Sequence, residues 1–279
     1  MQLAAAPTRP FATEHGRPHP VAHGIQAPRR AGVAGPTGYA QMRAAEETSL
    51  ELSDEPVVQA ALAAGQLIGG LGWRDTRDIH SDALDLGQDA AEQAGLVLGA
   101  LSGRMSRGDM QRVVEDGRRL DAADAVRAAA IAGALAADRG FAQMRDVVDA
   151  AISASGDETV QAAATFAALA QGVDGTRVRD VVGDATRIAG DGRMQAALAM
   201  GAIIGDVGSG QMRDAIEVAT ELSSEPVVQA AVAAGLLAGQ RSGGELREAL
   251  DSARDVSSDP LMQAALVFGD TAVQYRSGT

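Results

Sequence analysis

Hydrophobic positions recur along this chain in two alternating patterns, each about a dozen residues long. In residues 212–222, Met212, Ile216, Ala219 and Leu222 have the spacing of one helix face. Residues 227–239 follow with the run QAAVAAG, in which Ala and Gly gather on one segment and allow a neighbouring helix to approach closely. The chain is therefore predicted to form pairs of helices, one amphipathic and one rich in small residues.

The end signals between these segments support the same pairing. Ser223 and Ser224 interrupt the apolar pattern, and we expect Ser224 to cap the second helix. Pro226 suits a first-turn position, where a missing N–H costs nothing. An acidic residue recurs just before or within this turn and is expected to favour the positive helix end. Its members are Glu55, Asp89, Asp157, Asp191, Glu225 and Asp259.

The helix pair is an internal repeat of 34 residues. Residues 210–232 read GQMRDAIEVATELSSEPVVQAAV and residues 40–62 read AQMRAAEETSLELSDEPVVQAAL. Seven copies without an insertion fill residues 40–277, and residues 278–279 follow them. One hairpin cannot bury its own apolar face, so each copy needs its neighbours. We therefore predict an all-α fold, an α-solenoid (superhelix) of seven helical hairpins whose end repeats fray first.

Three rows of residues keep this register. A Gly row contains Gly65, Gly99, Gly133, Gly201, Gly235 and Gly269, with Ala167 in the remaining repeat. An Arg row contains Arg43, Arg77, Arg145, Arg179, Arg213 and Arg247, with Gln111 in the third repeat. A Gln row contains Gln59, Gln93, Gln161, Gln195, Gln229 and Gln263, with Arg127 in the third repeat.

The third repeat exchanges the two residue types, since Gln111 stands in the Arg row and Arg127 in the Gln row. A hydrogen bond between the two positions would tolerate such an exchange. We predict that the rows face one another as a guanidinium-to-amide ladder. The other hypothesis is that the Arg row binds a partner.

The second-helix segment, EPVVQAA at residues 55–61 and 225–231, resembles the corresponding segment of HEAT-like repeats. DAVRAAA at residues 124–130 resembles it further, because Arg127 matches the arginine of that family's second helix. The resemblance covers residues 40–277 and implies a right-handed superhelix with a concave binding face. Tetratricopeptide repeats require Trp, Tyr and Phe at positions that this chain lacks, and TAL-effector repeats require a basic surface.

Composition and charge limit the classes of molecule that could bind this chain. The formal net charge is −13, and the aromatic content is only 3%. Residues 1–39 carry four arginines against Glu14, a charge of +3, which leaves −16 on the remainder. Such an acidic surface disfavours nucleic acid and anionic lipid. No apolar run is long enough to span a membrane, so we expect a soluble monomer with a basic or neutral protein partner.

The tail, residues 1–39, has Pro, Gly, Arg and His without apolar periodicity and is predicted to be disordered. His15, His19 and His23 stand four apart, but Pro18 and Pro20 oppose the helix that would align them on a metal. The tail resembles the leaders of type III secreted bacterial effectors. The chain contains no Lys, which suits a protein delivered into a eukaryotic host, although a GC-rich genome also depletes Lys.

No catalytic, cofactor or metal-binding motif occurs in the sequence. The chain has no Cys, which excludes a disulfide, a thiolate metal site and a cysteine nucleophile. We therefore expect a non-enzymatic protein-protein interaction scaffold that binds a partner peptide or helix on the solenoid surface. It would act in the bacterial cytoplasm or be secreted into a eukaryotic host cell by a type III system. The competing hypotheses are an intracellular bacterial adaptor and a HEAT-like lyase, or lyase-associated protein, that attaches bilin chromophores.

Overall fold

The computed structural model describes residues 38–239 and 242–277, and within these ranges every regular element is an α-helix. The odd-numbered helices begin the repeats: α1 Tyr39–Leu52, α3 Trp73–Leu86, α5 Arg107–Arg118, α7 Phe141–Ala154, α9 Gly175–Ile188, α11 Ser209–Leu222 and α13 Gly243–Val256. The even-numbered helices end them: α2 Pro56–Gly69, α4 Ala90–Gly103, α6 Asp124–Ala137, α8 Glu158–Gln171, α10 Gly192–Gly205, α12 Pro226–Gly239 and α14 Pro260–Ser277.

The repeat prediction is confirmed, because both helix series start at intervals of 34 residues without a break. In the sixth repeat α11 starts at Ser209, three residues before the predicted start at Met212. The backbone N–H of Gly208 donates to Gln211 Oε1 at 3.1 Å, and this bond secures the additional turn. The expected tail lies outside the described residues apart from Gly38 and Tyr39, and Tyr39 begins α1.

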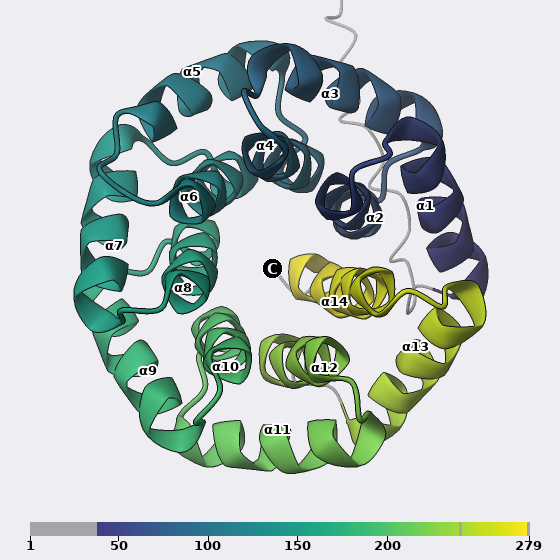
Figure 1. Ribbon diagram of the computed structural model, residues 1–279, viewed down its shortest axis with the longest axis vertical. Coiled ribbons are helices and arrows are strands. Elements are labelled where there is room, and N and C mark those ends of the chain that lie inside the picture. The colour runs from purple at the N-terminus through teal and green to yellow at the C-terminus, as the bar shows by residue number, and fades with distance from the viewer. Residues whose placement is uncertain (1–37, 240–241, 278–279) are drawn as a thin grey trace, which may run out of the picture. The chain divides into compact units, whose positions relative to one another are not determined.

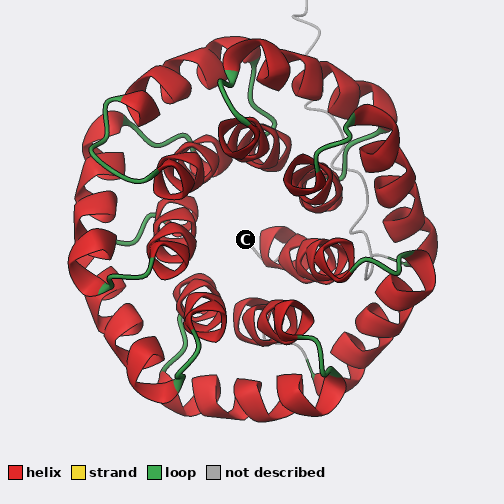
Figure 2. Cartoon of the chain, viewed as in Figure 1, coloured by secondary structure: helices red, strands yellow, loops and turns green. Residues whose placement is uncertain are grey.

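The two helix series form two layers of the seven-repeat domain, as Figure 1 shows. The odd-numbered helices follow one another around the outside and are called the outer wall. The even-numbered helices stand side by side within it and are called the inner ring. Short loops join each outer helix to its inner helix, as Figure 2 shows.

The seven repeats together close into a ring. Helix α14 packs against α2, and α1 packs against α13, so the last repeat contacts the first. The predicted all-α solenoid of seven helical hairpins is therefore confirmed, and its first and last repeats are in contact rather than separated along a superhelix. Because each end hairpin has a neighbour on both sides, the expectation that the end repeats fray first loses its physical basis.

The Gly row makes the close contacts within the inner ring. A Cβ atom placed on Gly99 would lie 2.6 Å from the carbonyl oxygen of Ala132 on the next inner helix. One placed on Gly269 of α14 would lie 3.1 Å from Ala64 Cα, across the contact that closes the ring. The missing side chains thus let six of the seven inner helices approach the next one closely, at the closure as well as elsewhere, and α8 has Ala167 in this row.

The outer wall has a stripe of buried apolar side chains and arginines that hydrogen-bond to backbone carbonyl groups of neighbouring outer helices. Met42, Met144 and Met212 are fully or almost fully buried against the inner ring. Arg118 Nη2 donates to the carbonyl oxygen of Leu86 at 2.7 Å, and Arg254 Nη2 donates to that of Leu222 at 3.0 Å. Each bond joins an outer helix to the exposed carbonyl end of the preceding one.

Candidate functional site

The Gln row ties the two helices of one repeat together. In five repeats the side-chain Nε2 donates to the carbonyl oxygen of the residue that directly follows the first helix, at 2.6 to 2.8 Å. The donors are Gln59, Gln161, Gln195, Gln229 and Gln263. These side chains are buried or half-buried, so the row satisfies carbonyl groups that would otherwise lack a partner.

Two members of the Gln row behave differently. Arg127 Nη1 donates to the carbonyl oxygen of Ala122 at 2.6 Å, and its Nη2 pairs with Asp124. A guanidinium in this row therefore still reaches the loop between the two helices. The side chain of Gln93 forms no hydrogen bond within the described part of the chain, although it packs against Gly87.

The Arg row lies on the exposed face of the outer wall. Arg43 pairs with Glu47 at 2.9 Å, Arg77 pairs with Asp78 at 2.8 Å, and Arg179 Nε lies 3.4 Å from Ser153 Oγ. Within residues 38–239 and 242–277 the other three members form no hydrogen bond or ion pair. These are Arg145, Arg213 and Arg247.

The predicted ladder between the two rows is wrong. Gln111 donates to Glu115 at 3.2 Å on its own helix, and Arg127 bonds to the loop of its own repeat. No hydrogen bond in the described ranges joins the two rows. The Arg row faces outward, whereas the Gln row faces the interhelix loop, so the exchange in the third repeat reflects two separate substitutions.

The acidic row caps the inner helices in part. The side chains of Asp89, Asp157 and Asp191 accept hydrogen bonds from backbone N–H groups of the first turn. Glu55 precedes α2 without such a bond. In the sixth repeat the hydroxyl of Ser223, rather than Ser224, accepts a bond, from the N–H of Glu225 at 3.1 Å. Because Glu225 directly precedes α12, this bond lies ahead of the helix, and the predicted cap by Ser224 is not formed among the described residues.

No group of three or more His, Cys, Asp or Glu side chains converges on a possible metal site in the ranges that the structure describes. His15, His19 and His23 lie outside these ranges. His80 on α3 is buried, its Nε2 has no hydrogen-bond partner, and burial lowers the pKa of its imidazole. None of the described helices is both long and apolar enough to cross a membrane.

The outer wall exposes large apolar side chains where α1 meets α3. Trp73, the single Trp of the chain, is 41% exposed and Leu50 is 51% exposed. The indole Nε1 of Trp73 donates to Glu51 Oε2 at 3.0 Å, and Arg77 Cζ lies 4.9 Å from the ring centroid. We call Leu50, Glu51, Trp73 and Arg77 the α1–α3 junction.

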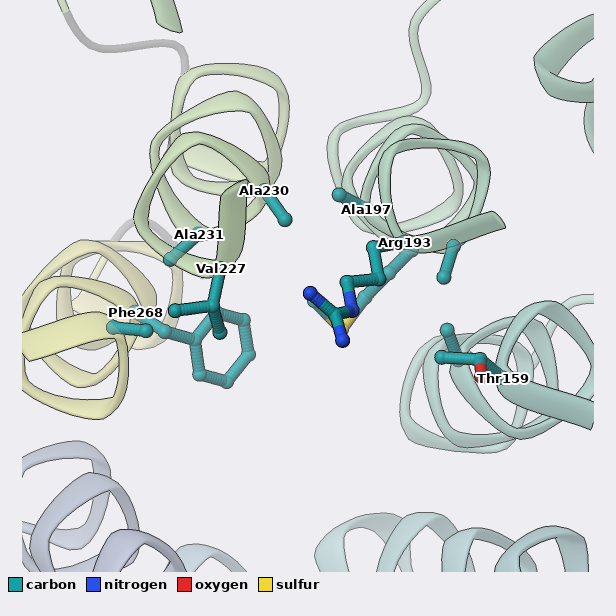
Figure 3. A pocket seen from close by; sticks show the side chains of 11 residues that line it. Thr159, Arg193, Ala197, Val227, Ala230, Ala231 and Phe268 are labelled. Carbon is teal, nitrogen blue, oxygen red and sulfur yellow. The ribbon is translucent and has the colours of Figure 1, made fainter. Parts of the chain in front are cut away.

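The inner ring contains a cavity of about 350 Å³ that is open to solvent and is lined by α8, α10, α12 and α14, as shown in Figure 3. Its lining consists mainly of alanines, with one Phe, one Met, one Val and two polar residues. The residues are Thr159 and Ala163 of α8, Arg193, Ala196, Ala197 and Met200 of α10, Val227, Ala230 and Ala231 of α12, and Ala264 and Phe268 of α14. The guanidinium of Arg193 extends into the space between Val227 and Thr159.

The sequence contained a signal for the cavity. Arg193 departs from its row, since Val57 and Val227 occupy the corresponding positions of α2 and α12. Trp73 starts α3, but Tyr39 and Phe141 start α1 and α7, so three repeats share an aromatic residue at this position. Position by position, the seven copies therefore mark Arg193 as exceptional but not Trp73.

No protein-family model matches the sequence, and no similarity to a curated protein or a solved structure is detected. The HEAT-like resemblance of residues 40–277 therefore stays a prediction. The case for a function depends on the described side chains.

Proposed function

We propose that this protein is a non-enzymatic interaction scaffold that binds a protein partner at the α1–α3 junction on its outer wall. The observation that carries the proposal is the exposed Trp73, whose ring is covered by Arg77 and whose indole N–H donates to Glu51. Leu50, the residue before Glu51, is exposed as well. Trp and Arg are the residues most often found at the energetic centre of protein interfaces.

The contacts of Trp73 favour a binding role over a packing role. Its indole N–H is already satisfied by Glu51, so a partner can cover the ring without leaving a buried unpaired donor. Arg77 and Glu51 hold the ring from two sides, which lowers the entropy lost when a partner immobilises it. An exposed Trp held in this way is pre-organised for contact.

The charge around the junction indicates the partner's character. Helix α1 carries Glu46, Glu47 and Glu51 against Arg43. An acidic surface around an apolar centre favours a partner with apolar side chains flanked by basic or neutral residues. This agrees with the expectation from the net charge of −13.

Quantitative affinity purification with the full chain tests the proposal. We expect Trp73→Ala to abolish the specific partners that the wild-type chain recovers from bacterial or host-cell lysate. Ile152→Ala is the matched control, because Ile152 is also an exposed apolar residue of the outer wall, 39% exposed on α7. Recovery of the same partners by Trp73→Ala would contradict this binding surface.

A triple variant distinguishes the α1–α3 junction from the Arg row as the binding surface of the outer wall. Replacing Arg145, Arg213 and Arg247 with Gln removes three exposed cations that form no bond within the described residues. If these substitutions abolish partner recovery while Trp73→Ala does not, the Arg row is the binding surface instead. Retention by the triple variant supports the α1–α3 junction.

The sequence supports a more specific version, in which the scaffold is exported into a eukaryotic host by a type III system. Its basis is the lysine-free chain and the basic leader of residues 1–39. Fusing residues 1–40 to a reporter tests this version directly. Export that depends on the type III apparatus supports it, and no export refutes it while leaving the scaffold proposal intact.

A further inference from the structure

The cavity of the inner ring is separate from the outer wall and has a different chemistry. Its eleven lining residues include six alanines, and these small side chains leave the space open. The row that contributes Ala196, Ala230 and Ala264 is Ala in all seven inner helices. The cavity is therefore a consequence of the repeat itself.

Arg193 makes this part of the ring different from the rest. It is the second residue of α10, and the corresponding residues of the other inner helices are Val57, Ala91, Ala125, Thr159, Val227 and Leu261. None of these is charged. Among the residues that line the cavity, all of them described, Arg193 alone carries a charge. The cation is thus a specific departure from an uncharged row.

The guanidinium of Arg193 forms no hydrogen bond or ion pair within the described part of the chain. Arg193 is solvent-exposed, and its side chain reaches into the open cavity with Thr159 on one side and Val227 on the other (Figure 3). The hydroxyl of Thr159, likewise without a hydrogen bond there, is a second donor on the same lining. A planar guanidinium matches a carboxylate in two parallel hydrogen bonds.

We infer that the cavity binds an anionic amphiphile, a monocarboxylate with an unbranched hydrocarbon chain, whose head group pairs with Arg193. The chain lies against Met200, Phe268 and the alanines of α10 and α12. At the roughly 30 Å³ that a water-sized group occupies, the cavity holds on the order of ten such groups. Decanoate has this size.

Acidic residues beside the cavity select the charge of the head group. Asp157 and Asp191 precede α8 and α10, two residues before Thr159 and Arg193, and both accept backbone N–H bonds at these helix ends. Their carboxylates repel every negative charge on a head group, and one guanidinium forms a two-bond pair with only a single carboxylate. A monocarboxylate is therefore favoured over a dianionic phosphate ester.

Calorimetric titration of the full chain with decanoate, below its micelle concentration, tests the inference. We expect one decanoate per chain and weaker binding of decanol and of decyl phosphate. Arg193→Gln should weaken decanoate binding by about 10- to 100-fold, because hydrogen bonds to a charged group contribute about 1.5 to 3 kcal/mol. It should leave decanol binding unchanged. Arg213→Gln, an exposed cation of the outer wall, is the control and should change neither.

A second variant tests the cavity independently of the charge. Ala230→Phe places a large side chain on the lining and should abolish binding of both decanoate and decanol, with circular dichroism confirming the fold. The inference is overturned if wild-type protein binds no decanoate, if Arg193→Gln binds it equally well, or if decyl phosphate binds more tightly. The Trp73→Ala variant should bind decanoate normally, so the proposed decanoate site and the proposed partner surface can be refuted independently of each other.

Discussion

At the scale of single residues, the Gln row shows how the repeat holds its own two helices. Gln229 Nε2 donates to the carbonyl oxygen of Ser223 at 2.7 Å, and the side chain is half-buried. A carbonyl in this position has no helical partner because it lies at the end of α11. The amide therefore replaces a bond that the helix cannot make.

Replacing Gln229 with Ala should lower the free energy of unfolding by about 1 kcal/mol, since a partly buried carbonyl loses its donor. Gln229→Arg should cost less, because Arg127 makes the corresponding bond to Ala122 at 2.6 Å in the third repeat. Urea unfolding followed by circular dichroism measures both. Gln93→Ala is the control, and a loss as large as that of Gln229→Ala would contradict the role given to the hydrogen bond.

His80 is the second residue whose environment makes a prediction. It occupies a position that is Val in three other repeats, at Val114, Val148 and Val182, and it is buried with its Nε2 unpaired. Burial lowers the pKa of the folded-state imidazole below its ordinary value of about 6.5. Above about pH 6.5 the neutral ring is present in both states. As the pH falls below that value, the unfolded chain takes up a proton that the folded chain does not, so stability falls.

His80→Val should therefore raise the free energy of unfolding by about 1 kcal/mol at neutral pH, because it removes an unsatisfied polar atom. It should also flatten the pH dependence between about pH 7.5 and about pH 5.5. Urea titrations of the wild type and the variant at both pH values measure the two effects. Equal slopes in the two proteins would show that His80 is not the group that titrates.

At the scale of helices, the sequence predicted most of what the structure shows, for a clear reason. Serines, a proline and an acidic residue mark the boundary between α11 and α12, and these signals are local. The predicted starts differ from the observed ones by one residue at Pro226 and three at Ser209. The ladder between the Arg and Gln rows failed because recurrence at one spacing does not determine which way a side chain points.

The Gly row gives the prediction at this scale. Gly201→Ala gains up to about 1 kcal/mol of helix propensity, but its Cβ would lie 2.8 Å from the carbonyl oxygen of Ala234. Overpacking of this kind costs about 1 to 3 kcal/mol, so we expect a net loss of stability. Gly183→Ala on α9 is the matched control, since no neighbouring atom lies within 4 Å of its Cβ. It should stabilise the protein by about 0.5 to 1 kcal/mol, and thermal unfolding compares the two.

At the scale of the whole seven-repeat domain, the closure of the repeats into a ring is the property that the sequence did not reveal. The repeat pattern determines which side chains lie between neighbouring hairpins, whereas closure depends on the angle between them summed over seven steps. A rotation slightly different from one seventh of a turn would leave an open superhelix from the same pattern. The cavity with Arg193 was missed for the same reason, because the lining of α8 meets that of α14 only when the inner helices curve around it.

Closure predicts how the ends behave in solution. In an open solenoid the terminal hairpins have one neighbour each and exchange their amide hydrogens first. Here α14 packs on α2 and α1 packs on α13. Hydrogen exchange should therefore protect α2 and the described part of α14 about as well as α6 and α8. Faster exchange confined to the first and last hairpins would show that the ring opens.

The contact between α14 and α2, which closes the ring, can be broken selectively. It is the one inner-ring contact between helices whose repeats are not consecutive in the chain. A Cβ on Gly269 would lie 3.1 Å from Ala64 Cα, and one on Gly201 would lie 2.8 Å from the Ala234 carbonyl oxygen, so Val crowds both sites. The chain directly connects the repeats on either side of Gly201 but not those on either side of the Gly269 contact. Gly269→Val should therefore raise the radius of gyration in small-angle X-ray scattering, whereas Gly201→Val should lower stability with little change in radius. An unchanged radius for Gly269→Val would mean that the curvature of the seven repeats closes the ring without this contact.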